Sequence, residues 1–366
     1  MSSNEAPGRK ARARDLGVPF DGNPGRWNAI TDVPGVTVGM STRVGPGGAR
    51  TGVTAVFPRG ATALGGVAAA VFAFNGTGEL TGAHQIREFG AFFGPVLLTG
   101  TTAVGTVSEA YLRWVGGLIA DEDQRFSRIL PVVGETWDGN LNDAWGFHVQ
   151  AQDVRAALEA ATGGAVAEGN VGGGTGMVCH GFKGGTGSAS RVVEVAGASY
   201  TVGVLVQANH GQRDDLLVAG LPVGRLISGF EPEPPASPLV DGSIIVVVAT
   251  DAPLQSAQLE RVAKRATIGL ARCGGFGGPL SGDIFLAFST AGEVALGGSP
   301  GMPGATLPGD ELDGLFHATA LATEEAIVNA LVAAETMQAE TGLRIHALPH
   351  EPLQALMRKR KELLDV

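Results

Sequence analysis

A short run of β-branched residues, Ile244–Val248, constrains the fold of this chain more than any other stretch. A continuous apolar run of this length, bounded by turn residues, is typical of a deeply buried strand. It follows directly on Asp241-Gly242-Ser243, which ends the Pro-rich approach GFEPEPPASPLV. The sequence therefore predicts a serine at the first position of a buried strand, behind a glycine and at the end of a flexible tether.

The other apolar patterns predict strands that come in runs and helices that come in groups. A hairpin is expected around the Pro34-Gly35 turn, and a second hairpin follows the glycine-rich centre of the chain. Further strands are expected at 51–60, 66–78 and 281–290, and helices at 102–119, 151–162, 254–275 and 323–337. This order favours an α+β fold, in which sheets pack face to face with helices outside, over regular β-α alternation.

Composition and charge exclude several classes of protein. Hydrophobic residues make up 44% of the 366, which is enough for a sizeable core. The net charge of −10 argues against a nucleic-acid partner, and the basic segments 8–15 and 358–361 lie near the termini as solvated ends. No apolar segment resembles a signal peptide or a membrane span, and the two cysteines lack a CxxC spacing. The expectation is a soluble, cytoplasmic protein with reduced, buried thiols.

The familiar site motifs are absent from the sequence. The glycine-rich stretches GNVGGGTGM and GFKGGTGS match neither GxxxxGK[ST] nor GxGxxG, and there is no GxSxG. The seven histidines are scattered without a metal-binding spacing, since a proline separates His346 from His350. The sequence predicts no cofactor and no metal, and we interpret the glycines as close backbone approaches.

The Gly242-Ser243 pair has two interpretations. It is either a glycine turn before a strand, or the processing site of an N-terminal nucleophile. In the second case the Ser243 hydroxyl attacks the carbonyl of Gly242, and the chain is cut there. The new α-amino group, with an ordinary pKa of about 8, then acts as the base for its own hydroxyl.

Several stretches decide between these interpretations when they are read in order. They are NAITDVPGVTVG, FNGTGELTG, ETWDG, GNVGGGTGM, GGTGSASR, VLVQANHG, DGSIIVVVATDAPL and SGDIFLAFST, from about residue 27 to residue 290. Together they resemble the β-peptidyl aminopeptidase family, which includes the L-aminopeptidase/D-esterase/amidases.

The resemblance implies a four-layer αββα sandwich like that of N-terminal nucleophile hydrolases, with a different connectivity. It implies one self-processing domain over residues 1–366, cut between Gly242 and Ser243 into an α chain (1–242) and a β chain (243–366). It also implies a homo-oligomer of αβ units, commonly four.

The resemblance also assigns roles to individual residues. Ser243 is the expected nucleophile, and Ser281 and Asp283 complete the catalytic group. The two-residue spacing of Ser281 and Asp283 supports their pairing independently, because alternate residues of a strand share a face. Without the resemblance, both would be turn residues before a strand. Some relatives carry a glutamate where this chain has Asp283, which has the shorter reach.

Three further residues are expected at the same site. Asn209 matches an oxyanion-hole amide, although alone it would be a turn residue. Glu135 matches a carboxylate that receives the substrate's ammonium group, with Trp137 as an aromatic wall beside it; alone, Glu135 would be a surface residue. Asn140 is left without a role.

The expected activity is that of a serine aminopeptidase that releases N-terminal residues from short peptides, amides or esters. β-Amino acids such as β-alanine are candidate substrates, as are L- and D-α-amino acids. Two alternatives stay open at this point. One is an amidase or acyltransferase with an N-terminal nucleophile, and the other is a non-catalytic metabolite-binding homologue.

Overall fold

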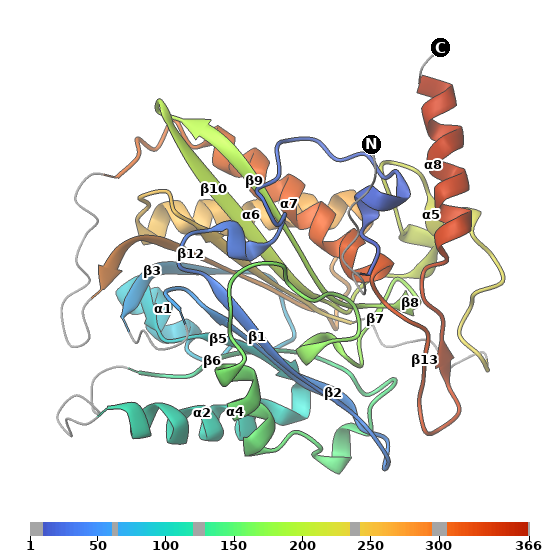
Figure 1. Ribbon diagram of the computed structural model, residues 1–366, viewed down its shortest axis with the longest axis horizontal. Helices are drawn as coiled ribbons and strands as arrows, with labels where there is room; N and C mark the ends of the chain where they lie inside the picture. The colour runs from blue at the N-terminus through green and yellow to red at the C-terminus, as the bar shows by residue number, and fades with distance from the viewer. Residues whose placement is uncertain (1–9, 61–64, 120–128, 235–241, 295–305, 365–366) are drawn as a thin grey trace.

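The computed structural model describes residues 10–60, 65–119, 129–234, 242–294 and 306–364 (Figure 1). Most of the tether before Gly242, residues 235–241, lies outside the described residues, as do residues 1–9, which include the start of the N-terminal basic segment. The flexibility expected of the tether is therefore left as a prediction.

Two sheets lie face to face in the middle of the molecule. The larger sheet has the order β4 (Ala91–Phe93), β3 (Gly66–Gly76), β12 (Gly282–Val294), β11 (Ile244–Thr250), β10 (Ala198–Ala208) and β9 (Gly185–Val195). The smaller sheet has the order β1 (Thr37–Val44), β2 (Arg50–Phe57), β5 (Val96–Gly100) and β6 (Val132–Thr136). Neighbouring strands are antiparallel, except that β11 pairs in parallel with β12 and β5 with β6.

Helices cover the outer face of each sheet (Figure 1). On the larger sheet lie α6 (Ser256–Arg272) and α7 (Asp313–Val332), and on the smaller sheet lie α2 (Val104–Leu118) and α4 (Ala151–Glu159). The result is the expected αββα sandwich. None of the helices in the described ranges has the length and apolar character that a bilayer span requires.

Shorter elements connect and flank these layers. Within the described residues, the remaining helices are α1 (Ala83–Phe89), α5 (Val223–Leu226) and α8 (His350–Leu364). Two small hairpins pair β7 (Val178–Cys179) with β8 (Phe182–Lys183), and β13 (Met337–Gln338) with β14 (Arg344–Ile345). Single 3₁₀ turns occur at Ala13–Leu16, Ile30–Asp32, Thr101–Ala103, Ala144–Gly146, Gly172–Gly174 and Arg213–Asp215.

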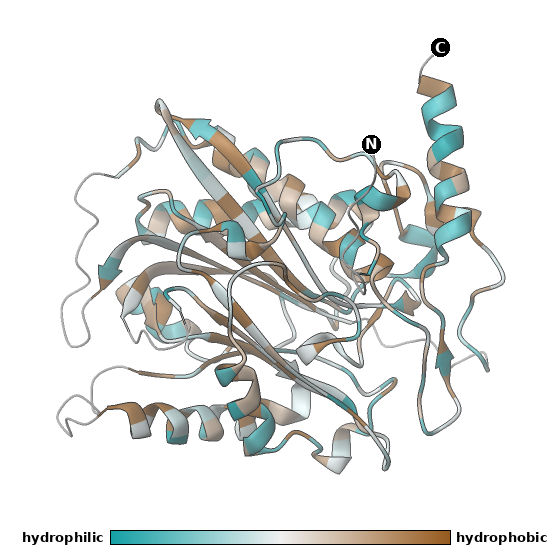
Figure 2. Ribbon diagram, in the orientation of Figure 1, coloured by the Kyte–Doolittle hydropathy of each residue, from teal (hydrophilic) through white to brown (hydrophobic). Residues whose placement is uncertain are grey.

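Strand β11 confirms the prediction of a deeply buried strand. Its alternate side chains enter two different cores, and both cores are apolar (Figure 2 colours apolar residues brown). Ile244, Val246 and Val248 pack toward α6 and α7, whereas Ile245, Val247 and Ala249 pack toward the smaller sheet. A strand covered on both faces has no solvent side, which is why its sequence shows no polar alternation.

The prediction of a hairpin around Pro34-Gly35 is wrong. Residues 30–32 form a 3₁₀ turn, and β1 begins after the Pro-Gly turn and pairs with β2, with Thr37 opposite Phe57. The apolar residues before the turn, Ile30 and Val33, instead fill the core between the sheets. The alternation of apolar and polar residues before this turn therefore reflects the burial of Ile30 and Val33, and it does not indicate a strand.

Helix α7 begins ten residues earlier than the sequence pattern suggests. The expected helix started at Thr323 with acidic residues in its first turn, but the observed helix starts at Asp313. Glu325 is therefore buried in the middle of the helix, where it forms ion pairs with Arg14 and with the buried Arg191, both at 2.7 Å. This network connects the N-terminal arm and β9 to the helical layer.

Close contact between α7 and β9 leads to a stability prediction. A Cβ at Gly187 would lie 2.0 Å from the carbonyl oxygen of Ala326, which is helix backbone and cannot rotate away. We expect Gly187→Ala to lower the free energy of unfolding by about 1–3 kcal/mol, the usual cost of overpacking. Thermal unfolding monitored by circular dichroism measures this effect. Gly163→Ala is the matched control, because a Cβ there meets nothing within 4 Å. Equal midpoints for the two variants would contradict the prediction.

Candidate active site

The site lies where the parallel strands β11 and β12 begin. Because β11 and β12 run in parallel with Ile244 opposite Asp283, the residues that precede each strand lie side by side at one edge of the larger sheet. Ser243 precedes β11, and Ser281 precedes β12. Antiparallel pairing brings the end of β10 to the same edge, with Ala208 opposite Ile244. This arrangement places Ser243, Ser281 and Asp283 together, as the sequence predicts.

Hydrogen bonds connect these residues around the Gly242–Ser243 peptide bond. The Gly282 N–H donates to Ser243 Oγ at 2.9 Å. Ser281 Oγ lies 2.8 Å from the Gly242 carbonyl oxygen and 2.6 Å from Asp283 Oδ1. A serine hydroxyl has one proton to donate. The Ser281 hydroxyl can therefore donate to the Gly242 carbonyl or to the Asp283 carboxylate, but not to both at once.

Asn209 touches the same peptide from the other side. Its backbone N–H donates to the Ser243 carbonyl at 3.2 Å. Its side-chain oxygen accepts the Val178 N–H at 2.8 Å, and its side-chain nitrogen donates to the Trp137 carbonyl at 2.9 Å. The amide is held rigidly by these bonds, with one of its two N–H groups engaged by Trp137.

Only glycine fits before Ser243. A Cβ on Gly242 would lie 1.6 Å from the Asn209 carbonyl oxygen and 2.7 Å from the Asn209 side-chain nitrogen. The carbonyl is backbone, so a larger residue would displace either strand end. Glycine at this position thus lets the peptide bond approach the Asn209 amide closely.

Glu135 reaches this region from the end of β6 in the smaller sheet. Its carboxylate accepts a hydrogen bond from the Glu79 N–H at 2.9 Å and another from the Thr101 hydroxyl. A Cβ on Gly78 would lie 3.3 Å from Glu135 Oε1 and 3.0 Å from the Gly282 Cα. Gly78 therefore separates the Glu135 carboxylate from the backbone that holds Ser243 Oγ.

Burial controls the charge of the acidic groups here. Burial raises the pKa of Glu135, although the hydrogen bonds from Thr101 and Glu79 oppose this effect. Burial also raises the pKa of Asp138 to about 6, and the nearby Glu135 adds to the shift. Two buried carboxyl groups in one region favour either a proton or a bound cation.

Two other residues of this segment lie near the site. The Trp137 carbonyl accepts the Asn209 side-chain N–H, and the Trp137 ring packs against Gly139, where a Cβ would lie 2.2 Å from the indole. Asn140 lines a cavity of about 120 Å³ beside Gly242. A second cavity, of about 210 Å³, is lined by Gly242, Ser281 and Asp283. Two cavities therefore adjoin Gly242.

The glycine-rich centre lines this space only in part. Gly181 lines the smaller cavity. In contrast, Gly173 and Gly174 pack against other layers, because a Cβ on either would come within 2.6 Å of the backbone of Leu98 or of Gly185 and Thr186. These glycines mainly permit close crossing of the layers, in line with the close backbone approaches that the sequence predicts.

Sequence reasoning missed three groups that the structure brings to the site. They are the Gly282 N–H, the Thr101 hydroxyl and the Asp138 carboxyl. The aspartate lies within the quoted ETWDG stretch, so its position was a usable signal. The Gly282 N–H belongs to the backbone, and Thr101 is a single threonine outside any motif. Neither carries a sequence signal of its own.

Comparisons with known proteins agree with this geometry. The pattern of Peptidase family S58 matches residues 28–345. The chain is 49% identical to the β-peptidyl aminopeptidase BapA of Sphingosinicella xenopeptidilytica, over 95% of this chain and 91% of that protein. Among solved structures, the L-aminopeptidase D-Ala-esterase/amidase of Ochrobactrum anthropi is 47% identical, with a TM-score of 0.88 over 96% of this chain and 99% of that one. A β-aminopeptidase of a Burkholderia species is also 47% identical, with a TM-score of 0.86 over 95% and 99%.

The αββα sandwich and these matches define a peptidase with a variant of the N-terminal nucleophile hydrolase fold. This excludes the non-catalytic alternative. The chain belongs to peptidase family S58.

The raised pKa of Asp138 predicts a pH-dependent stability difference. A carboxyl group with a folded pKa of about 6, against 3.8 ordinarily, stabilises the fold below pH 4 and loses this contribution as the pH rises through 6. Asp138→Asn removes the titration. The free energy of unfolding of the variant minus that of wild type should therefore be larger at pH 7 than at pH 4, by up to about 3 kcal/mol. Thermal unfolding of both proteins from pH 4 to 8 measures this change, and a constant difference across the range would refute it.

Proposed function

We propose that this chain is a self-processing serine aminopeptidase, cut between Gly242 and Ser243 into an α chain (1–242) and a β chain (243–366) of one domain. The observation that carries the proposal is the pair of contacts around this peptide bond. The Gly282 N–H donates a hydrogen bond to Ser243 Oγ, and the Ser281 hydroxyl lies within hydrogen-bond distance of the Gly242 carbonyl oxygen.

The first step is an N-to-O acyl shift. Ser243 Oγ attacks the Gly242 carbonyl carbon, the C–N bond breaks, and the Ser243 nitrogen takes the proton that leaves the hydroxyl. Negative charge develops on the Gly242 oxygen, where the Ser281 hydroxyl can donate to it at 2.8 Å. Water then cleaves the ester, so that Gly242 leaves as a carboxylic acid and Ser243 Oγ recovers its proton.

The second step uses the nucleophile released in the first. Ser243 acquires an α-amino group, which serves as the base for its own hydroxyl. Ser281 and Asp283 stay within hydrogen-bond reach of each other, at 2.6 Å, and can move a proton to the departing amine. The Asn209 amide, which lies beside Gly242, supplies an N–H to the acyl oxygen. Loss of one such donor typically costs about 10²–10³ in rate.

Glu135 explains the preference for a free N-terminus. A buried carboxylate needs a cation, and the substrate ammonium group supplies one. Because Glu135 approaches from the other sheet, it can fix the amine while the larger sheet holds the reacting carbonyl. Short peptides, amides and esters fit this arrangement. β-Amino acids such as β-alanine are the first candidates, because one relative is named a β-peptidyl aminopeptidase. L- and D-α-amino acids are the next, because another is named an L-aminopeptidase D-Ala-esterase/amidase.

The remaining expectations stay predictions. No step above uses a cofactor. The homotetramer of αβ units and the cytoplasmic location are implied by the family resemblance and by sequence signals. An amidase or acyltransferase acting on an acylated small molecule is the alternative, and it differs in needing no free substrate amine.

Self-processing predicts the behaviour of Ser243→Ala. This variant should remain one full-length chain without peptidase activity, because it lacks both the nucleophile and the new N-terminus. Wild type should give two fragments, with Ser243 at the start of the second. Denaturing gels, intact mass and N-terminal sequencing measure this result. Ser199→Ala, at the exposed start of β10, is the control and should be cut like wild type. Cleavage of Ser243→Ala after Gly242 would exclude the mechanism.

Recognition of the amine predicts a selective defect in Glu135→Gln. Its kcat/KM for β-alanyl-p-nitroanilide should fall by roughly 100-fold or more, because a buried cation loses its partner. Self-cleavage should persist, since the Gly242–Ser243 bond has no free amine. Steady-state kinetics and denaturing gels measure the two effects.

Two controls sharpen this test. Glu88→Gln changes an exposed carboxylate near the end of α1 that takes no part in the hydrogen bonds of Glu135, so it should retain wild-type kinetics. N-acetylated β-alanyl-p-nitroanilide should not be hydrolysed by wild type. Comparable rates on the free and acetylated substrates would instead support the amidase alternative.

A further inference from the structure

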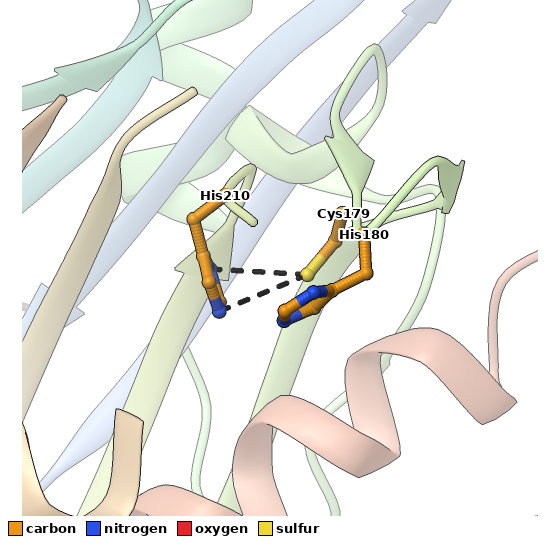
Figure 3. Close-up of side chains that lie close together, drawn as sticks. All are labelled: Cys179, His180 and His210. Carbon is orange, nitrogen blue, oxygen red and sulfur yellow. Dashed lines mark hydrogen bonds between the residues drawn. The ribbon is translucent and has the colours of Figure 1, made fainter. Parts of the chain in front are cut away.

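A buried group of one thiol and two imidazoles lies beside the candidate active site. Cys179 and His180 come from the β7–β8 hairpin, and His210 follows the end of β10 next to Asn209. Figure 3 shows the three side chains pointing toward one another, and one possible ligand atom from each lies within 4.8 Å of the other two. Such a group was not expected from the sequence, since about thirty residues separate its two parts.

We propose that Cys179, His180 and His210 form a binding site for a divalent cation of the zinc class. A thiolate and imidazoles are the ligands that Zn²⁺ and related borderline-soft ions prefer. Binding releases the thiol proton as the sulfur–metal bond forms, while both imidazoles coordinate in their neutral form.

The separation of Cys179 and His210 suits a single ion. Cys179 Sγ lies 3.8 Å from His210 Nδ1 and 4.0 Å from His210 Nε2. With Zn–S near 2.3 Å and Zn–N near 2.0–2.1 Å, a separation of 3.8 Å corresponds to an S–Zn–N angle of about 120°. This angle is close to tetrahedral, and three protein ligands leave the fourth position of a tetrahedral ion open.

The orientation of His180 supports the assignment independently. Its Nδ1 lies 2.9 Å from the Gln212 carbonyl oxygen, to which it donates, and this leaves the lone pair on Nε2. Nε2 is buried and has no hydrogen-bond partner among the described residues. Metal-binding histidines commonly use one nitrogen for a backbone carbonyl in this way, because the bond fixes the ring and its tautomer.

The local backbone is shaped around this imidazole. His180 and Gly181 both have positive φ, 49° and 66°, in a two-residue turn between paired β7 and β8. Asn and Gly are the usual residues in such a turn, and Gly181 meets this preference at the second position. Gly211 also accommodates the ring, since a Cβ there would lie 2.2 Å from it.

A bound cation would stabilise the part of the active site that contains Asn209, the proposed oxyanion-binding residue. The Val178 N–H donates to the Asn209 side chain at 2.8 Å, and the His180 N–H donates to the His210 carbonyl at 2.7 Å. The ion would therefore clamp the hairpin onto the segment that carries Asn209. His210 also lines the two cavities beside Gly242, which provide a route for the ion.

Cobalt binding tests the proposal without depending on peptidase activity. Full-length, tag-free protein treated with a chelator is titrated with Co²⁺. We expect saturable binding of one ion per chain, with a sulfur-to-cobalt charge-transfer band and the intense visible bands of a tetrahedral site. Cys179→Ala should lose the charge-transfer band, and its affinity should fall by more than about 100-fold. Cys273→Ala is the matched control, because Cys273 is the other buried free cysteine and should leave the spectrum unchanged.

A second measurement keeps the test valid if Cys179→Ala fails to fold. X-ray absorption of the wild-type Zn²⁺ complex should show one sulfur near 2.3 Å and imidazole nitrogens near 2.0–2.1 Å. A shell of nitrogen and oxygen alone, absence of saturable binding, or a folded Cys179→Ala that keeps the sulfur-to-cobalt band would each overturn the proposal.

Discussion

Parallel pairing of β11 with β12 is the constraint on which the rest of this structure depends. It is the reason that Ser243 and the Ser281–Asp283 pair share one sheet edge, and it requires β11 to be central and covered on both faces. Helices on one side and a second sheet on the other provide that cover. The sandwich therefore holds the start of β11 rigidly, which a nucleophile on a strand end needs.

The second sheet does more than cover the first. It brings Glu135 to the same edge from β6, so that the group proposed to bind the amine and the group proposed to attack the carbonyl belong to different layers. Burial between the layers raises the pKa of Glu135 and of Asp138. The site is thus suited to a cationic ligand before any substrate is considered, and part of the stability of the fold is given up to keep these acids buried.

Close backbone approach is the third recurring feature. Gly187 allows β9 to meet α7, Gly173 allows the chain to cross β5, and Gly242 allows the peptide bond to reach Asn209. The same short distances connect the β7–β8 hairpin to the segment carrying Asn209 and His210. The many glycines of this chain therefore reflect dense crossing of layers more than loops that bind phosphate.

The sequence by itself determined the elements whose cause is local. The β-branched run of β11, the stripe of α6 and the two-residue spacing of Ser281 and Asp283 predicted their own structures, because period and side-chain shape act within a few residues. Family resemblance added the sandwich and the candidate residues. Tertiary structure decided the rest: which strand β1 pairs with, the role of the Trp137 carbonyl, the approach of Glu135 from another sheet, and the meeting of Cys179 and His180 with His210. These depend on contacts between distant segments, and a single sequence carries no periodic signal for such contacts.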